Sequence, residues 1–111
     1  MLKDLQKRIF QNKVNKGFNI SADYHGINQE ISFLAEELGE LAHHHRRGNR
    51  EMVVDSVVDI LVYALGLLQI LGADADIEID KVLEEIEKRV YIQHEDGTLK
   101  KVRATNDRIE P

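Results

Sequence analysis

The chain of 111 residues contains no cysteine and no tryptophan, and its single proline is the last residue, Pro111. Without cysteine there is no disulfide framework, no thiolate metal site and no thiol nucleophile. Because no proline lies inside the chain, no helix is interrupted by a missing backbone donor. Basic side chains are also in deficit, with 15 against 20 acidic ones, which gives a net charge of −5. This balance argues against a protein that binds nucleic-acid backbones.

Continuous apolar runs are scarce. The first residues, Met-Leu-Lys-Asp-Leu-Gln-Lys-Arg, lack the apolar stretch of a signal peptide. Residues 52–71 are aliphatic and almost long enough to cross a bilayer, but they include Asp55, Asp59 and Gln69. Each central aspartate costs about 2.5–3.5 kcal/mol on insertion, which roughly cancels the gain from the aliphatic side chains. We therefore expect a cytoplasmic protein that does not enter a membrane.

The composition of the chain predicts a small folded domain with an aliphatic core. Apolar residues make up 42% of the chain and charged residues 32%, which is typical of a globular protein. Apolar side chains recur at spacings of three and four residues. This period predicts four helices, at about residues 2–14, 27–46, 50–71 and 76–90. Glycines separate the segments.

The end of the chain has a different pattern. Asp96-Gly97 lies between two segments that favour extended structure, within residues 91–102. Because Asp-Gly favours a tight turn, we expect a β-hairpin here. A disordered tail is expected after about residue 104. The predicted organisation is a helical domain over residues 1–92, followed by a C-terminal hairpin or flexible tail over residues 93–111.

The third predicted helix, residues 50–71, is apolar nearly all the way round. Such a helix is expected to be buried on most sides, and four helices of this length cannot enclose one of their number completely. A dimer that continues the bundle would cover it. The predicted fold class is therefore all-α, a four-helix bundle completed by oligomerisation. The alternative is a well-packed central helix within one chain.

Four acidic residues lie beside the apolar faces of the second and third predicted helices. Glu37 borders the apolar stripe of its helix, and Glu40 extends the same flank. Asp55 and Asp59 are one turn apart on the narrow polar side of the next helix. The short Gly48-Asn49 connection favours antiparallel packing, which would bring the two pairs of carboxylates together.

A cluster of carboxylates suits a hard cation, Mg²⁺ above all, with Mn²⁺ as an alternative ion. Ionised carboxylates beside a buried surface are costly unless they are paired or bound to metal. No basic residue lies within residues 55–69 to pair with the two aspartates. The alternative is that the acids line a solvent groove or pair with Arg46, Arg47, Arg50 or Lys81.

Two blocks on these helices resemble motifs of the MazG-like all-α nucleoside triphosphate pyrophosphohydrolases. Ala35-Glu36-Glu37-Leu38-Gly39-Glu40-Leu41-Ala42 is similar to their Glu-Glu-x-Gly-Glu-Leu signature. Asp55-Ser56-Val57-Val58-Asp59-Ile60-Leu61-Val62-Tyr63 is similar to their Glu-x-x-Asp helix. Lys16-Gly17-Phe18 and Arg46-Arg47-Gly48 fit the same family, so the resemblance covers roughly residues 10–90.

The resemblance implies a helical bundle, a homodimer or homotetramer, that binds Mg²⁺ and a nucleoside triphosphate. Members of the family cleave between the α- and β-phosphates and release a nucleoside monophosphate and pyrophosphate. A house-cleaning role is one expectation. Glu37 and Glu40 match Glu-x-x-Glu, and Asp59 matches the aspartate of Glu-x-x-Asp. Glu37 and Glu40 are thus the implied catalytic residues, and Glu37, Glu40 and Asp59 the implied metal ligands.

Ser56 departs from the family pattern, because it stands where the glutamate of Glu-x-x-Asp is expected. A serine hydroxyl carries no charge and is a weaker ligand for Mg²⁺ than a carboxylate. Asp55 is adjacent, but it lies on the other side of Asp59 around the helix. Either Asp55 supplies the missing oxygen as a further metal ligand, or metal binding is weakened or lost.

Basic and aromatic residues are needed to hold the nucleotide. Candidates for the outer phosphates are Lys13 and Lys16 near the first loop, and Lys81, Lys88 and Arg89 on the fourth helix. Phe33 is a candidate for stacking on the base. The alternative for each of them is an ordinary surface or core position.

Other chemistries have little support in the sequence. There is no Gly-x-x-x-x-Gly-Lys-Ser/Thr loop for phosphates. The three consecutive histidines 43–45 cannot converge on one ion, because neighbouring helical residues point about 100° apart. Glu40 and His43 have the Glu-x-x-His spacing of di-iron bundles, but a second such motif is missing. The remaining rival is a non-catalytic nucleotide-binding or interaction module on the same fold, which Ser56 favours.

Overall fold

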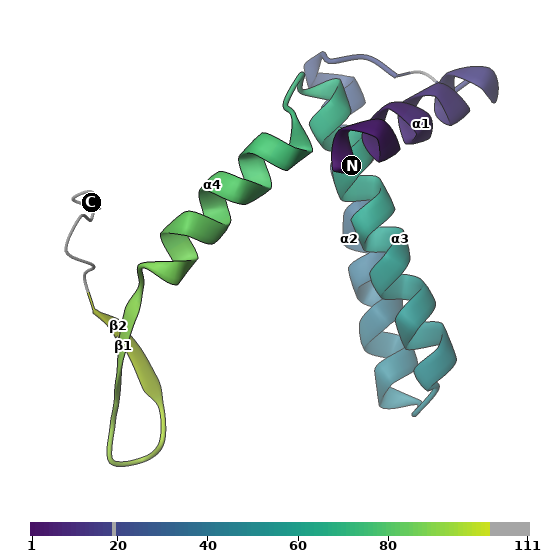
Figure 1. Ribbon diagram of the computed structural model, residues 1–111. Helices are drawn as coiled ribbons and strands as arrows, with labels where there is room; N and C mark the ends of the chain where they lie inside the picture. The colour runs from purple at the N-terminus through teal and green to yellow at the C-terminus, as the bar shows by residue number, and fades with distance from the viewer. Residues whose placement is uncertain (19, 103–111) are drawn as a thin grey trace. The chain divides into compact units, whose positions relative to one another are not determined.

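The computed structural model describes residues 1–18 and 20–102. Within them the chain forms four helices and one antiparallel hairpin, which confirms the predicted all-α class with a C-terminal hairpin (Figure 1). Completion of the bundle by oligomerisation stays a prediction. The observed helix bounds lie within three residues of those predicted. The elements are α1 (Leu2–Asn15), α2 (Tyr24–Arg46), α3 (Arg50–Ile70), α4 (Ala75–Glu87), β1 (Val90–Gln93) and β2 (Leu99–Val102).

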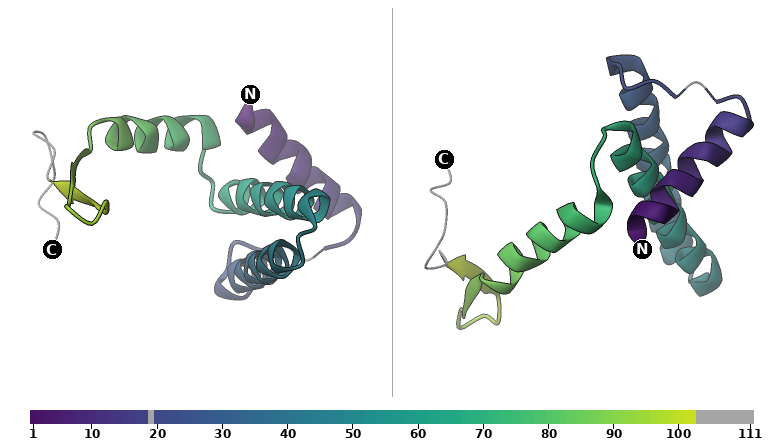
Figure 2. Two further views of the ribbon diagram at one scale, coloured as in Figure 1. Left: turned by 90° about the horizontal axis from the view of Figure 1, so that it is seen from below. Right: turned by 45° about the horizontal axis from the view of Figure 1, so that its top comes forward.

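Helices α2 and α3 form a long antiparallel hairpin, as the Gly48-Asn49 connection predicted (Figures 1 and 2). The Asn49 side chain accepts a 3.2 Å hydrogen bond from the backbone N–H of Met52 and so caps α3. Asp23 caps α2 in the same way, accepting a 2.8 Å bond from the N–H of Gly26. This cap explains why α2 begins at Tyr24, three residues earlier than its apolar pattern indicates.

Helix α1 packs across α3 (Figure 2). At the crossing Gly66 removes a side chain, and a Cβ there would lie 3.2 Å from Ile9 Cγ2. The amide of Gln6 is almost wholly buried and donates to Gln69 Oε1 at 3.0 Å and to the Ala73 carbonyl at 2.8 Å. The close approach at Gly66 and the hydrogen bonds of the Gln6 amide therefore fix the position of α1 on α3.

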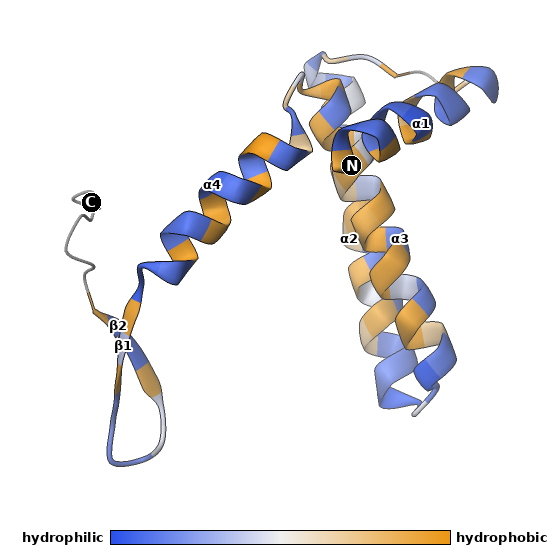
Figure 3. Ribbon diagram, in the orientation of Figure 1, coloured by the Kyte–Doolittle hydropathy of each residue, from blue (hydrophilic) through white to orange (hydrophobic). Residues whose placement is uncertain are grey.

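The apolar core of the described residues is small, because Leu65 and Ala75 are the buried apolar side chains. Large parts of α3 are open instead, including Val54, Val57 and Leu61, each about half exposed. Figure 3 shows apolar residues along much of the α3 ribbon. The expectation that α3 is buried on most sides is therefore not met within a single chain. By length and composition alone, this helix would be able to cross a membrane.

The chain divides into two compact units between Asp76 and Ile77, and each is described by itself. The predicted domain boundary near residue 92 stays a prediction. In the second unit, β1 and β2 pair from Val90↔Val102 to Gln93↔Leu99. The turn contains Asp96 and Gly97, whose φ of +88° is a conformation that favours glycine, so the predicted hairpin is confirmed. The predicted tail after residue 104 lies outside the described residues.

Candidate active site

Three of the predicted acidic residues form a cluster between α2 and α3. Glu37 is half-buried, and Glu40 follows it by one turn of α2. The pKa of the Glu37 carboxyl is raised, first because burial disfavours its charge and then because the carboxylates of Glu40 and Asp59 are close. The antiparallel packing of the helices therefore brings acids from both motifs to one place.

One oxygen of Glu37 has no partner. Among the described side chains, Glu37 Oε2 is the buried polar atom without a hydrogen bond. Such an atom normally has a partner because a buried unpaired acceptor is costly. Its neighbours are carboxylates, which repel it when ionised, and oxygen donors of this kind are the ligands that hard divalent cations prefer. The donor set therefore fits Mg²⁺ or Mn²⁺.

The acids are not yet arranged as a finished coordination sphere. Within residues 1–18 and 20–102, no three His, Asp or Glu side chains converge closely enough to hold an ion. Glu40 and Asp59 are exposed, so their side chains have room to turn towards Glu37. Binding an ion here would therefore require at least these side chains to turn.

Ser56 and Asp55 have opposite surroundings on α3. Ser56 is buried, with 3% of its surface exposed, whereas Asp55 is exposed. The neighbouring charges that raise the pKa of Glu37 are those of Glu40, Asp59 and Glu36. The position that departs from the family pattern is thus the enclosed one. Whether Asp55 supplies an oxygen stays a prediction.

An aromatic pair lies one helical turn from the acids. The rings of Phe33 and Tyr63 are 5.6 Å apart and tilted by 37°. Phe33 precedes Glu37 by four residues on α2, and Tyr63 follows Asp59 by four residues on α3. Burial raises the pKa of the Tyr63 hydroxyl, and the charge of Glu37 raises it further. Tyr63 was not among the predicted site residues, although it follows Asp59 by four residues, the spacing that places both on one face of a helix.

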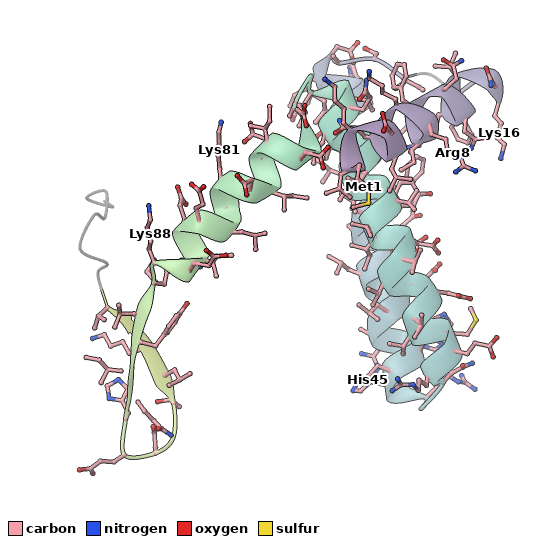
Figure 4. The ribbon with its side chains drawn as sticks, in the orientation of Figure 1. Met1, Arg8, Lys16, His45, Lys81 and Lys88 are labelled. Carbon is pink, nitrogen blue, oxygen red and sulfur yellow. The ribbon has the colours of Figure 1, made fainter. Side chains whose placement is uncertain are left out.

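Lys13 is engaged within the fold. Its Nζ donates to Glu30 Oε2 at 2.6 Å, and both side chains are largely buried. Lys16 is exposed at the end of α1 (Figure 4). Lys88 and Arg89 follow α4 in the second compact unit, so they, with Lys16 and Phe33, stay predictions as substrate-binding residues.

The three histidines belong to the last turn of α2, and Figure 4 shows His45 at the turn between α2 and α3. The rings of His43 and His44 meet edge to face at 5.6 Å. His43 and His45 are exposed, while His44 is half-buried. This spread agrees with the expectation that three consecutive helical residues point in different directions.

Comparisons with known proteins agree with the fold and the motifs. A search of curated proteins gave no match. Among solved structures, the chain is similar to a protein described as a cyanophage S-2L MazG-like pyrophosphohydrolase bound to dGDP and three catalytic Mn²⁺ ions per active site. The TM-score is 0.63, the identity is 24%, and 92% of each chain is covered, which shows a shared fold.

The sequence itself matches a family over residues 26–97, a segment that includes the acidic cluster, the aromatic pair and the hairpin turn. That family is described as the MazG nucleotide pyrophosphohydrolase domain. The match covers well over half of the chain, and the architecture of four helices and a hairpin agrees with it. The chain therefore belongs to the MazG nucleotide pyrophosphohydrolase domain family.

Proposed function

We propose that this chain is a metal-dependent nucleoside triphosphate pyrophosphohydrolase that releases a nucleoside monophosphate and pyrophosphate. The observation that carries the proposal is the unpaired buried oxygen of Glu37, next to Glu40 and Asp59. The family match supports the reaction class. An isolated acidic cluster without these two facts would be an ordinary surface feature.

The proposed metal ligands are Glu37, Glu40 and Asp59, with Asp55 as a further candidate. Mg²⁺ is the proposed ion and Mn²⁺ the alternative, which is supported by the Mn²⁺ ions described for the cyanophage protein. When bound, such an ion neutralises charge on the phosphate oxygens. The net charge of −5 makes this neutralisation important, because both protein and substrate are anionic.

Glu37 is the proposed general base. Glu40 is the second proposed catalytic residue, and it shares metal binding with Glu37. The half-buried carboxylate of Glu37 lies beside Glu40 and Asp59, so it is close to the place proposed for the ion and the attacking water. It accepts a proton as the water oxygen attacks the α-phosphorus. The bond from that phosphorus to the bridging oxygen breaks, and pyrophosphate leaves with the electron pair.

The nucleotide is proposed to lie along the α2–α3 hairpin, with its base near Phe33. Lys16, Lys88 and Arg89 remain the proposed contacts to the outer phosphates. We propose a house-cleaning role in the cytoplasm, without binding to nucleic acid or to a membrane. The dGDP described for the cyanophage protein supports a nucleotide substrate.

A homodimer or homotetramer is proposed to cover the open face of α3. Val54, Val57 and Leu61 are each about half exposed there, and burying them would gain about 25 cal/mol per Å². Light scattering at micromolar concentration should report at least a dimer, and Leu61→Asp should shift it towards the monomer. A monomeric wild-type chain would contradict this part of the proposal.

The function is tested by measuring pyrophosphate release across a panel of nucleoside triphosphates, with Mg²⁺, with Mn²⁺ and with a chelator. Wild type should be active only with metal. Glu37→Gln and Asp59→Asn should each lower kcat/KM by about 10²-fold or more, the range expected for a catalytic base or a metal site. Glu36→Gln is the matched control, because Glu36 is exposed on the same helix and should lose less than about threefold.

The alternative is a non-catalytic nucleotide-binding module, and the buried Ser56 in place of a carboxylate favours it. Such a module would gain thermal stability with metal and nucleotide together by mass action on the folded state. It would release no pyrophosphate with any nucleotide of the panel. The two outcomes separate the enzyme from its rival.

A further inference from the structure

Lys13 joins three helices through one buried ammonium group. Its Nζ lies 2.6 Å from Glu30 Oε2, with 13% of the lysine side chain and 5% of the glutamate side chain exposed. The same Nζ lies 5.0 Å from the centroid of the Tyr63 ring on α3, within the range of a cation–π interaction. The other ion pairs among the described residues are far more exposed. The ion pair is hereafter called the Lys13–Glu30 bridge.

The bridge connects two helices that do not pack on each other. Helix α1 packs on α3 and α3 on α2, but the described parts of α1 and α2 make no direct packing contact. Lys13 therefore reaches over the surface of α3 to arrive at Glu30. On its way the ammonium passes Gly66, where a Cβ would lie 3.4 Å from Lys13 Nζ, an ordinary van der Waals distance. A bridge of this kind fixes the position of whatever lies beneath it on α3.

Tyr63 lies beneath the bridge and beside the acidic cluster. Its ring contacts that of Phe33, and the charges of Glu37, Glu30 and Asp59 all act on its hydroxyl. Because Phe33 and Tyr63 are each four residues from an acid of the cluster, the aromatic pair and the acids occupy successive turns of the antiparallel hairpin. Movement of Tyr63 would change the surface next to the acids.

We propose that Lys13 is a positioning residue: the Lys13–Glu30 bridge holds Tyr63 against Phe33, and this aromatic pair is the surface on which the nucleoside of the substrate packs. The inference rests on the proposed function. It adds Tyr63 as a determinant of nucleoside binding and gives the buried charge pair a role. Lys13 touches neither the substrate nor the reacting atoms.

The first experiment measures the position of Tyr63 without any nucleotide. The chain has three tyrosines and no tryptophan, and Tyr24 and Tyr91 are exposed. The full-length double variant Tyr24→Phe, Tyr91→Phe therefore leaves Tyr63 as the sole fluorophore. In this background, Lys13→Met with Glu30→Gln removes both charges while keeping the side-chain volumes, which is tolerated better than breaking one side of a buried pair.

Acrylamide quenching of Tyr63 fluorescence should increase at least twofold in the variant without the bridge, with helical circular dichroism unchanged. Lys7→Met is the matched control, because Lys7 is an exposed lysine of the same helix. The Tyr63 fluorescence of this control should be quenched as much as that of the background protein. Equal quenching with and without the bridge overturns the proposal. If Lys13→Met alone does not fold, the charge-free pair still decides the question.

The second experiment measures kinetics with the nucleotide that wild type hydrolyses fastest. Loss of the bridge should raise KM at least fivefold and change kcat less than threefold, because packing of the nucleoside contributes equally to the ground state and the transition state. Tyr63→Ala should likewise raise KM with little change in kcat. Its effect on KM should not add to that of losing the bridge. An unchanged KM, or a fall in kcat alone, overturns the proposal. A wild type without turnover refutes the proposed function, while the quenching experiment still tests whether Lys13 positions Tyr63.

Discussion

The side-chain carbonyl of Gln6 accepts a 2.7 Å hydrogen bond from the backbone N–H of Ala75, although 69 residues separate the two. The same amide donates to the side chain of Gln69 and to the carbonyl of Ala73. Gln6 is 1% exposed, and its bond with the Ala75 N–H is buried, while the other two are partly buried. One buried amide therefore fastens α1 to the connection between α3 and α4.

Replacing Gln6 by alanine should lower the free energy of unfolding by about 1–3 kcal/mol. The change removes the partner of the buried Ala75 N–H and of the partly buried Ala73 carbonyl, and a buried group without a partner carries a desolvation cost. Gln11→Ala is the control, since Gln11 is exposed and bonds only along its own helix, to Asn15. Urea unfolding of the two variants measures the difference, and equal midpoints would contradict the assigned role of Gln6.

Two glycines of α2 should respond to alanine in opposite ways. At Gly26 a Cβ would collide with the backbone carbonyl of Ser21, so Gly26→Ala should cost about 1–3 kcal/mol. At Gly39 nothing lies within 4 Å of an added Cβ, so Gly39→Ala should stabilise by about 0.5–1 kcal/mol through the lower entropy of the unfolded chain. Thermal melting ranks the pair, and a loss at Gly39 would show that another molecule occupies that space.

Glu37 should make the metal-free protein less stable as the pH rises. Its pKa in the folded state lies above the ordinary value of 4.5, so the folded chain holds this proton more tightly than the unfolded chain. Below that ordinary value the group has no effect. Between it and the raised pKa, stability falls with increasing pH, and above both values the loss is constant.

The measurement compares urea unfolding of wild type and Glu37→Gln at pH 4 and pH 7 in a chelator. Relative to wild type, the glutamine variant should be more stable at pH 7 than at pH 4. Mn²⁺ or Mg²⁺ should offset the penalty in wild type at pH 7 and have less effect on the variant. If stability changes with pH in the same way in both proteins, the raised pKa of Glu37, and with it its place in the acidic cluster, is contradicted.

Ser56→Glu tests whether the α3 motif lacks a ligand. Because Ser56 is 3% exposed, a glutamate there should destabilise the metal-free protein by crowding and by burying a charge. If the position is the vacant ligand site, metal should restore the stability and raise metal affinity and pyrophosphate release together. A variant that stays destabilised in saturating metal would mean that the position does not face the ion.

Asp55→Asn gives the complementary result. If Asp55 supplies the missing oxygen, its replacement should abolish metal-dependent stabilisation and activity. If it is only an exposed charge on α3, the variant should behave as wild type in both measurements. Metal titrations followed by melting temperature decide between the two.

The local features of the fold were predictable because they depend on neighbours in the sequence. Apolar spacing predicted the four helices, and Asp96-Gly97 predicted the hairpin. The start of α2 was placed too late, since the Asp23 cap extends it beyond the apolar pattern. The cluster of Glu37 with Glu40 and Asp59 followed from helix period and a short connection, which are also local properties.

Contacts between distant segments were not predictable in the same way. Nothing in the sequence spacing indicates that Gln6 bonds to Ala75, or that Lys13 passes Gly66 to reach Glu30. These contacts depend on the angle at which α1 crosses α3, and that angle is set by packing. Lys13 was accordingly one candidate for the substrate phosphates from sequence, whereas its ammonium pairs with Glu30 inside the fold.

The acidic cluster is carried by one helix–turn–helix segment, residues 37–59, whose pairing involves residues close in sequence. Such segments form early in folding because little loop entropy is lost. At neutral pH we therefore expect this segment to bring like charges together before the more distant α1 docks. If the proposed metal site forms with the hairpin, a divalent cation should offset that repulsion and speed folding. The supply of divalent cations is then expected to affect the rate at which this chain folds, and not only its activity.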